Sequence, residues 1–96
     1  MLIKSASVIV PAYRAVSTLD QCIGSLLAQS QRPETYELIV IDDASPDDTA
    51  AMAESYIDKA KAQGIDMRVI RLEKNGGPAR ARNAGARVAT GDVIIF

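Results

Sequence analysis

Two adjacent carboxylates, Asp42 and Asp43, stand directly after an apolar run in the middle of the chain. The run at 38–41 (Leu-Ile-Val-Ile) has no polar alternation, which is typical of a strand covered on both faces of a parallel sheet. In open α/β sheets, ligands bind at the carboxyl ends of the strands. Successive strand residues point to opposite sides, so we expect one carboxylate to contact a ligand. The other would order the turn or pair with an arginine.

Two further segments follow predicted strands, Pro11-Ala12-Tyr13 and residues 75–83. A parallel sheet would gather them with the acidic pair at one edge. Taken singly, each feature has an ordinary explanation. The aspartates would stabilise the positive end of a helix dipole, and Tyr13 would pack at the rim. Gly76-Gly77 would form a turn, and the arginines beyond it would face solvent. The glycine loop matches neither dinucleotide-binding nor P-loop motifs, so the residues alone predict an α/β ligand-binding domain.

The elements that must position these residues alternate between strand and helix. The hydrophobic pattern predicts strands at 7–10, 36–41, 67–72 and 93–96, with helices that begin near 17, 45 and 78. For the second helix we expect Ser45 as the N-cap, Pro46 at the first helical position and Gly64 as the stop. The order βαβαβαβ predicts a parallel sheet with right-handed crossovers and helices on both faces.

Composition narrows the class of protein. The chain has 96 residues, enough for one small domain, and its net charge of −1 argues against a general nucleic-acid binder. A single cysteine, Cys22, excludes an internal disulfide. The absence of histidine excludes Ser-His and Cys-His nucleophile pairs and a His-ligated metal. No apolar run approaches the roughly 20 residues that span a bilayer, so we expect no membrane segment and no signal peptide.

Four motifs together resemble the family 2 glycosyltransferases of GT-A fold. They are Ser-Val-Ile-Val-Pro-Ala-Tyr, Ile-Val-Ile-Asp-Asp-Ala-Ser-Pro-Asp-Asp-Thr, Asn-Gly-Gly-Pro-Ala-Arg-Ala-Arg-Asn-Ala-Gly and Gly-Asp-Val-Ile-Ile-Phe, which cover essentially the whole chain. The resemblance implies a Rossmann-like three-layer α/β/α fold with strand order 3-2-1-4. It also implies inverting transfer of a sugar from a nucleotide-sugar donor, usually UDP-linked, to an acceptor.

Residue roles follow from the same resemblance. Pro11 and Tyr13 resemble the wall beside the uracil, with Tyr13 stacking on the base, and Asp43 resembles the carboxylate that accepts from the uracil imide N–H. Arg82 and Asn83 match family positions near the nucleotide and its phosphates, and Gly91-Asp92 matches a small-acidic step before the fourth strand. The predicted nucleotide-binding residues are Pro11, Ala12, Tyr13, Asp42, Asp43, Gly77, Arg82 and Asn83.

The catalytic part of the family pattern is not in this sequence. In the family, a strand such as 93–96 leads into an Asp-x-Asp motif that holds Mn²⁺ or Mg²⁺ on the diphosphate, and a later carboxylate serves as the general base. We therefore expect residues 1–96 to be the donor-recognition portion of a longer domain, inactive alone. The resemblance places the full-length enzyme in the cytoplasm or at the cytoplasmic face of a membrane, and leaves the acceptor unspecified.

Two other classes compete with this interpretation. A receiver-like signalling domain also has an acidic pair at strand ends, but there the pair follows the first strand and a later lysine completes the site. A non-catalytic nucleotide-binding or self-assembling module is the stronger alternative. Leaving Ile94, Ile95 and Phe96 uncovered at a sheet edge would favour pairing with a second copy, so we expect a homodimer through this edge.

Overall fold

The computed structural model describes residues 5–28, 35–91 and 93–95. Strands and helices alternate as predicted, except that the second predicted helix is two shorter helices. In chain order the elements are β1 (Ser5–Ala12), α1 (Val16–Ala28), β2 (Thr35–Asp42), α2 (Thr49–Glu54), α3 (Ile57–Ala62), β3 (Asp66–Arg71), α4 (Pro78–Val88) and β4 (Val93–Ile95). Within the described ranges, no helix is long and apolar enough to cross a membrane.

The strands form one parallel sheet in the order β3-β2-β1-β4, which confirms the expected order. β1 and β2 pair along their whole length, from Ser5 opposite Thr35 to Ala12 opposite Asp42. The chain steps in one direction from β1 to β3 and then returns to the far side of β1 for β4, so the order reverses at β1. Ligands in open α/β sheets bind outside the carboxyl ends of the strands at such a reversal.

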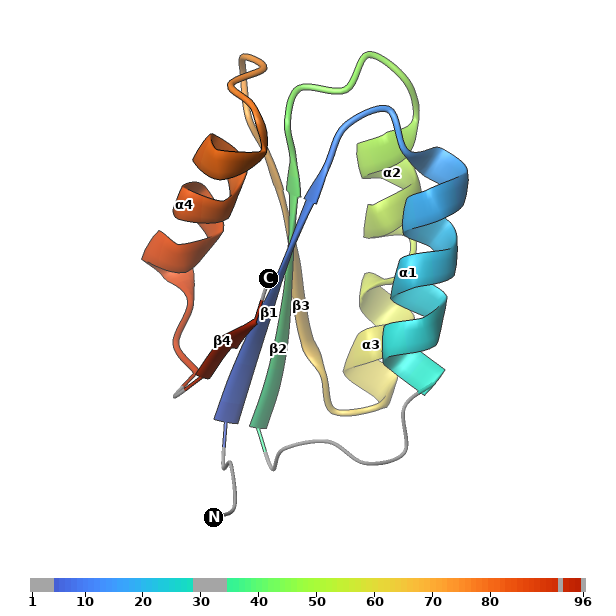
Figure 1. Ribbon diagram of the computed structural model, residues 1–96. Helices are drawn as coiled ribbons and strands as arrows, with labels where there is room; N and C mark the ends of the chain where they lie inside the picture. The colour runs from blue at the N-terminus through green and yellow to red at the C-terminus, as the bar shows by residue number, and fades with distance from the viewer. Residues whose placement is uncertain (1–4, 29–34, 92, 96) are drawn as a thin grey trace.

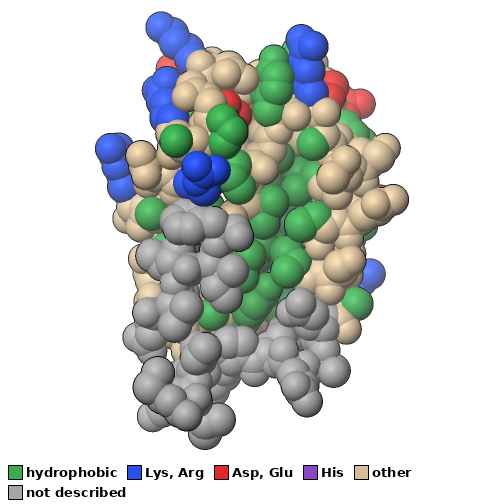
Figure 2. All heavy atoms as spheres, in the orientation of Figure 1, with side chains coloured by type: hydrophobic (Ala, Val, Ile, Leu, Met, Phe, Trp, Pro, Cys, Tyr) green, Lys and Arg blue, Asp and Glu red, His purple; other side chains and the backbone are tan. Residues whose placement is uncertain are grey.

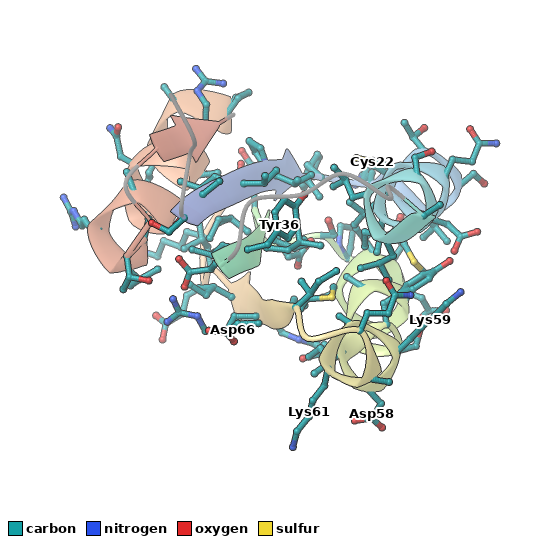
Figure 3. The ribbon with its side chains drawn as sticks, turned by 90° about the horizontal axis from the view of Figure 1, so that it is seen from below. Cys22, Tyr36, Asp58, Lys59, Lys61 and Asp66 are labelled. Atoms are coloured by element: carbon teal, nitrogen blue, oxygen red, sulfur yellow. The ribbon has the colours of Figure 1, made fainter. Side chains whose placement is uncertain are left out.

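Helices cover both faces of the sheet, as predicted (Figure 1). The helices α1, α2 and α3 lie over one face and α4 over the other, and Figure 3 shows the same layers from the amino edge. Between Leu38 and Ile41, every residue of β2 is 0% exposed. Leu38 and Val40 belong to the core under α1–α3, whereas Ile39 and Ile41 belong to the core under α4. Each buried side chain contributes about 1.5–3 kcal/mol, which makes β2 the centre of the fold.

Small residues let α4 approach the sheet closely. Ala81 and Gly85 are buried against β1 and β2. A Cβ atom at Gly85 would lie only 2.5 Å from Cγ2 of Ile9. The helix therefore sits where no larger side chain fits, and this close packing places its first turn at the carboxyl edge of the sheet.

The second helix begins later than the sequence indicated. We expected a helix capped by Ser45 with Pro46 in its first turn, but α2 begins at Thr49. The Ser45 hydroxyl instead accepts a hydrogen bond from the backbone N–H of Arg14, in the β1–α1 turn, at 2.9 Å. Asp48 stands at the N-cap of α2 and makes no side-chain cap bond, while Asp47 Oδ1 accepts from the Thr49 backbone N–H at 3.1 Å. The predicted cap is thus used in a long-range contact.

The same helix is interrupted at Ser55, whose hydroxyl donates back to the Met52 carbonyl at 2.5 Å. Such local bonds compete with the helical pattern, and the chain resumes as α3 two residues later. Gly64 ends α3 as predicted. It has φ of 77°, and the Ile65 N–H donates to the Ala60 carbonyl at 2.9 Å, the six-to-one bond of a Schellman motif.

A buried carboxylate, Glu37, lies near the amino end of β2, where the sequence indicated no site. Its Oε2 accepts from Ser7 Oγ at 2.7 Å and from the Thr90 N–H at 3.0 Å, while Arg68 donates to Oε1 and to the Val88 carbonyl. Burial raises the pKa of Glu37, but the bonds from Ser7, Thr90 and Arg68 outweigh it and hold the pKa below its ordinary value of 4.5. Glu37 therefore fixes the turn from α4 into β4.

The fourth strand, β4, pairs with β1 as expected. Asp92, Phe96 and the side chains of Val93–Ile95 lie outside the described part of the structure, so the homodimer through this edge stays a prediction. Figure 2 shows hydrophobic side chains gathered along the middle of the face that carries β4, between α4 and α1.

Candidate functional site

A cavity of about 420 Å³ opens at the carboxyl edge of the sheet. Three segments that are far apart in sequence converge on it, as expected from the parallel topology: the end of β1, the end of β2, and the loop before α4 together with the first turn of that helix. The lining residues are Pro11, Ala12, Tyr13, Asp43, Asn75, Gly77, Pro78 and Ala81. The cavity lies beside β1, where the strand order reverses.

Asp43 joins these three segments. Its backbone N–H donates to the Ala12 carbonyl at 2.8 Å, which ties β2 to the end of β1. Its carboxylate accepts from the backbone N–H groups of Gly76 and Gly77, one on each oxygen, both at 2.9 Å. The Asn75 side-chain amide donates to the Asp43 carbonyl at 3.3 Å. The N–H groups of Gly76 and Gly77 therefore fix the orientation of the Asp43 carboxylate.

The Asp43 carboxylate keeps unused hydrogen-bonding capacity. It is 4% exposed, yet it forms part of the cavity wall. A carboxylate has about four lone-pair sites, and the two glycine N–H groups occupy two of them. The group can accept from an N–H or O–H of a ligand in the cavity and cannot donate while it is ionised. The site is suited to a ligand with a hydrogen-bond donor at that position.

Tyr13 supplies the opposite kind of surface. Among the described residues, it is the one large hydrophobic side chain that is exposed, at 42%. It follows Pro11, which has no backbone N–H, at the point where β1 ends. An exposed aromatic ring beside a fixed carboxylate acceptor matches a flat heterocycle that stacks and donates at its edge.

Asp42 points away from the cavity, as the alternation of strand residues predicted. Its side chain is 3% exposed, and its Oδ2 accepts from the Ser45 backbone N–H at 3.2 Å, which orders the turn. Oδ1 has no hydrogen-bond partner among the described residues. Glu54 first, and Asp42 more weakly, raise the pKa of Arg71, so a cation lies near this carboxylate. Asp42 therefore supports the loop, and Asp43 alone of the pair faces the cavity.

The structure does not bring Arg82 and Asn83 to the cavity wall. Both lie on α4 one turn beyond its start, Arg82 half-buried and Asn83 exposed. The helix turns its small residues toward the sheet, which leaves Ala81 as its deepest contribution to the wall. Asn75, Pro78 and Ala81 were not singled out from the sequence, although all three belong to the rim segment that was. The Asn-Gly-Gly-Pro turn was the available signal.

The described residues contain no group of three or more His, Cys, Asp or Glu that could hold a metal ion. The described side chains alone therefore supply no such cluster for the Mn²⁺ or Mg²⁺ that the resemblance implies for the full-length enzyme. This part of the chain offers an exposed aromatic ring and a fixed carboxylate acceptor in one cavity.

Comparison with known families gives a match over nearly the whole chain. The family model described as Glycosyl transferase family 2 matches residues 7–96. The chain belongs to glycosyl transferase family 2. The matched range includes all three segments that line the cavity. The resemblance seen in the four motifs is confirmed.

Relatives in family 2 are much longer than this chain. It is 34% identical over 91 residues to poly(ribitol-phosphate) beta-N-acetylglucosaminyltransferase TarS of Staphylococcus aureus, covering 94% of the chain and 15% of TarS. It is 41% identical over 90 residues to an uncharacterized glycosyltransferase of Haemophilus influenzae, covering 94% of the chain and 34% of that protein. The chain thus spans about a third or less of the relatives it matches.

Solved structures confirm the GT-A-like α/β fold predicted for family 2. TarS 1-349 in complex with UDP superposes with a TM-score of 0.80 at 32% identity, covering 96% of this chain and 26% of that one. The mannosyltransferase PcManGT of Pyrobaculum calidifontis, in complex with GDP-Man and Mn²⁺, gives a TM-score of 0.85 at 22% identity, covering 98% and 26%. The second likeness shows the fold alone.

Proposed function

We propose that this chain binds the nucleotide of a UDP-sugar donor in the cavity at the carboxyl edge, as the donor-recognition part of an inverting family 2 glycosyltransferase. The observation that carries the proposal is the fixed Asp43 carboxylate, with free lone pairs, in the same cavity as the exposed Tyr13 ring. Family membership and the UDP complex of TarS support the same conclusion.

The chemistry of the bases explains the choice of uracil. Its ring carries an imide N–H that can donate to Asp43 while the ring face stacks on Tyr13. Cytosine and adenine present a lone pair at the corresponding ring nitrogen. Two acceptors would then face each other, and no hydrogen bond would form between them. Guanine also carries a ring N–H and is the second candidate, because the Asp43 acceptor suits it equally.

Calorimetric titration with UMP, CMP, AMP and GMP tests the proposal. We expect UMP to bind and CMP and AMP to bind at least tenfold more weakly. Tyr13→Ala should weaken UMP by about 1–3 kcal/mol, the usual worth of stacking a base on an aromatic ring. Lys59→Ala is a matched control, because Lys59 lies on α3 beside the Tyr56 ring and away from the cavity. Equal binding of UMP, CMP and AMP would contradict the proposal, and tighter binding of GMP would select guanine instead.

We also propose that residues 1–96 bind the donor without transferring its sugar. The described side chains include no group of three or more candidate ligands that could hold the Mn²⁺ or Mg²⁺ proposed for the whole enzyme. Incubating the chain with UDP-sugars and either metal should give no free sugar and no transferred sugar by mass spectrometry. Turnover by the purified chain would overturn this part of the proposal and leave the nucleotide site untouched.

A further inference from the structure

The ring of Tyr13 carries a cation on one side. The guanidinium carbon of Arg14 lies 5.4 Å from the centroid of the Tyr13 ring, within the range of about 6 Å for cation–π attraction. Tyr13 lines the cavity, and Arg14 does not. The guanidinium therefore lies near a ring that forms part of the cavity wall, while Arg14 itself is outside the set of lining residues.

Arg14 also has an unusual backbone. Its φ is 48°, in the left-handed region that residues with a Cβ atom seldom adopt. Two side chains, one in the β2–α2 loop and one at the start of α2, accept hydrogen bonds from this turn. The Arg14 N–H donates to Ser45 Oγ at 2.9 Å, and the Ala15 N–H donates to Thr49 Oγ1 at 3.1 Å. Ser45 and Thr49 thus fix the backbone conformation that brings the Arg14 guanidinium near the Tyr13 ring.

The supporting loop is itself ordered. Thr49 Oγ1 donates to Asp47 Oδ1 at 2.5 Å, and the Thr49 N–H donates to the same oxygen at 3.1 Å. These bonds from Thr49 lower the pKa of Asp47, and the nearby Arg14 charge adds to the effect. Arg14 therefore has the Tyr13 ring at 5.4 Å and contributes weakly to the lowered pKa of Asp47.

We propose that Arg14 is a positioning residue for the nucleotide base: it covers the outer side of Tyr13 and holds the ring for stacking in the cavity. This inference rests on the proposed function. A different role for an exposed arginine at this rim is direct contact with the donor phosphates, and the two roles differ in what they act on. Positioning of the ring affects every ligand that carries the base, whereas a phosphate contact affects only ligands that carry phosphate.

NMR titrations with uridine and with UDP separate the two roles. We expect Arg14→Ala to weaken both ligands by the same factor, about 2- to 5-fold, which corresponds to about 0.5–1 kcal/mol. The double variant Tyr13→Ala with Arg14→Ala should bind no more weakly than Tyr13→Ala alone, because the arginine acts through the ring. Arg14→Lys should restore part of the loss, since it keeps a cation near the ring.

Alanine keeps a Cβ atom, so the backbone cost at φ 48° is the same in the variant and in the wild type. Lys59→Ala removes a cation near a different tyrosine ring, 6.0 Å from the centroid of Tyr56. This variant should change the affinity for neither uridine nor UDP. Arg14→Gln, which keeps side-chain length, replaces Arg14→Ala if a thermal melt shows that the alanine variant is unfolded.

A loss seen for UDP and not for uridine would overturn the inference and make Arg14 a phosphate ligand. Unchanged binding of both ligands would overturn it as well. Failure of the wild-type chain to bind either ligand would overturn the proposed function, and this inference with it. Binding by the wild type with a normal UMP preference but no effect at Arg14 would remove the inference alone.

Discussion

Glu37 and Asp43, two buried carboxylates at opposite ends of β2, are used differently. Glu37 at the amino edge and Asp43 at the carboxyl edge are both 4% exposed. Glu37 accepts from Ser7, from the Thr90 N–H and hydroxyl, and from Arg68. Among the described residues, only two glycine N–H groups donate to the Asp43 carboxylate, which borders a cavity. The first carboxylate has used its acceptor capacity within the fold, and the second has kept about half of it.

This difference indicates that burial alone does not identify a binding residue. A buried carboxylate whose lone pairs are all occupied stabilises the structure and has nothing left to offer a ligand. A buried carboxylate that is fixed in place and keeps unused lone pairs beside a cavity can accept a hydrogen bond from a ligand. Substitutions at the amino edge should therefore change stability and leave affinity alone, whereas those at the carboxyl edge should change affinity.

The largest effect is expected for Glu37→Ala. It leaves Ser7 Oγ and the Thr90 N–H without their acceptor and leaves Arg68 without its carboxylate. Because Arg68 is partly exposed, we expect a loss of about 2–4 kcal/mol in the free energy of unfolding, less than for a fully buried pair. Urea denaturation measures it. The affinity for UMP, measured where the variant is folded, should be unchanged, and a loss of affinity would erase the distinction between the edges.

A smaller effect, on both properties, is expected for Gly77→Ala. Gly77 has φ of 91°, which strains any residue with a Cβ, and its N–H donates to the Asp43 carboxylate. We expect a loss of about 1–2 kcal/mol in stability and weaker UMP binding, because the carboxylate loses one of its two fixed partners. Gly64→Ala is the control: it has the same kind of strain, at φ 77°, far from the cavity. Its stability should fall without a change in affinity.

The smallest effect is the dependence of stability on acid. The folded pKa of Glu37 lies below its ordinary value of 4.5, so the contribution is fully present above that value and is lost as pH falls through the lowered pKa. Glu37→Gln should therefore make the unfolding free energy fall less steeply below pH 4.5 than in the wild type. Denaturation curves between pH 3 and 7, a range chosen to bracket that value, measure the slope. Parallel curves for the two proteins would show that Glu37 has the same pKa in the folded and unfolded chains.

The sequence predicts the fold well because the apolar pattern of β2 lies within one short stretch of neighbouring residues. A run of apolar residues without alternation, followed by two carboxylates, predicts a central strand with a ligand-binding rim. The strand is buried, and a cavity lies at that rim. The helix start was wrong for a non-local reason. Ser45 fits the local cap pattern, but its hydroxyl is taken by Arg14, 31 residues earlier in the chain.

The candidate site was predictable in part for the same reason. Asp43, Tyr13 and Gly77 follow strand ends, so topology alone brings them together. Arg82 and Asn83 came from family resemblance, and the direction in which α4 faces the sheet leaves them off the cavity wall. The Glu37 network was invisible in the sequence, because its bond from Thr90 joins residues 53 positions apart.

Exchanging a carboxylate for an amide at each edge tests most directly whether Asp43 reads the base. We predict that Asp43→Asn weakens UMP by about 10-fold or more, since a charge-assisted hydrogen bond is worth about 1.5–3 kcal/mol, and that CMP does not weaken, because the amide N–H₂ can donate to its ring nitrogen. Glu37→Gln, the same exchange at the amino edge, should leave the UMP to CMP ratio as in the wild type. An equal loss for UMP and CMP in Asp43→Asn would contradict the claim that this carboxylate recognises uracil.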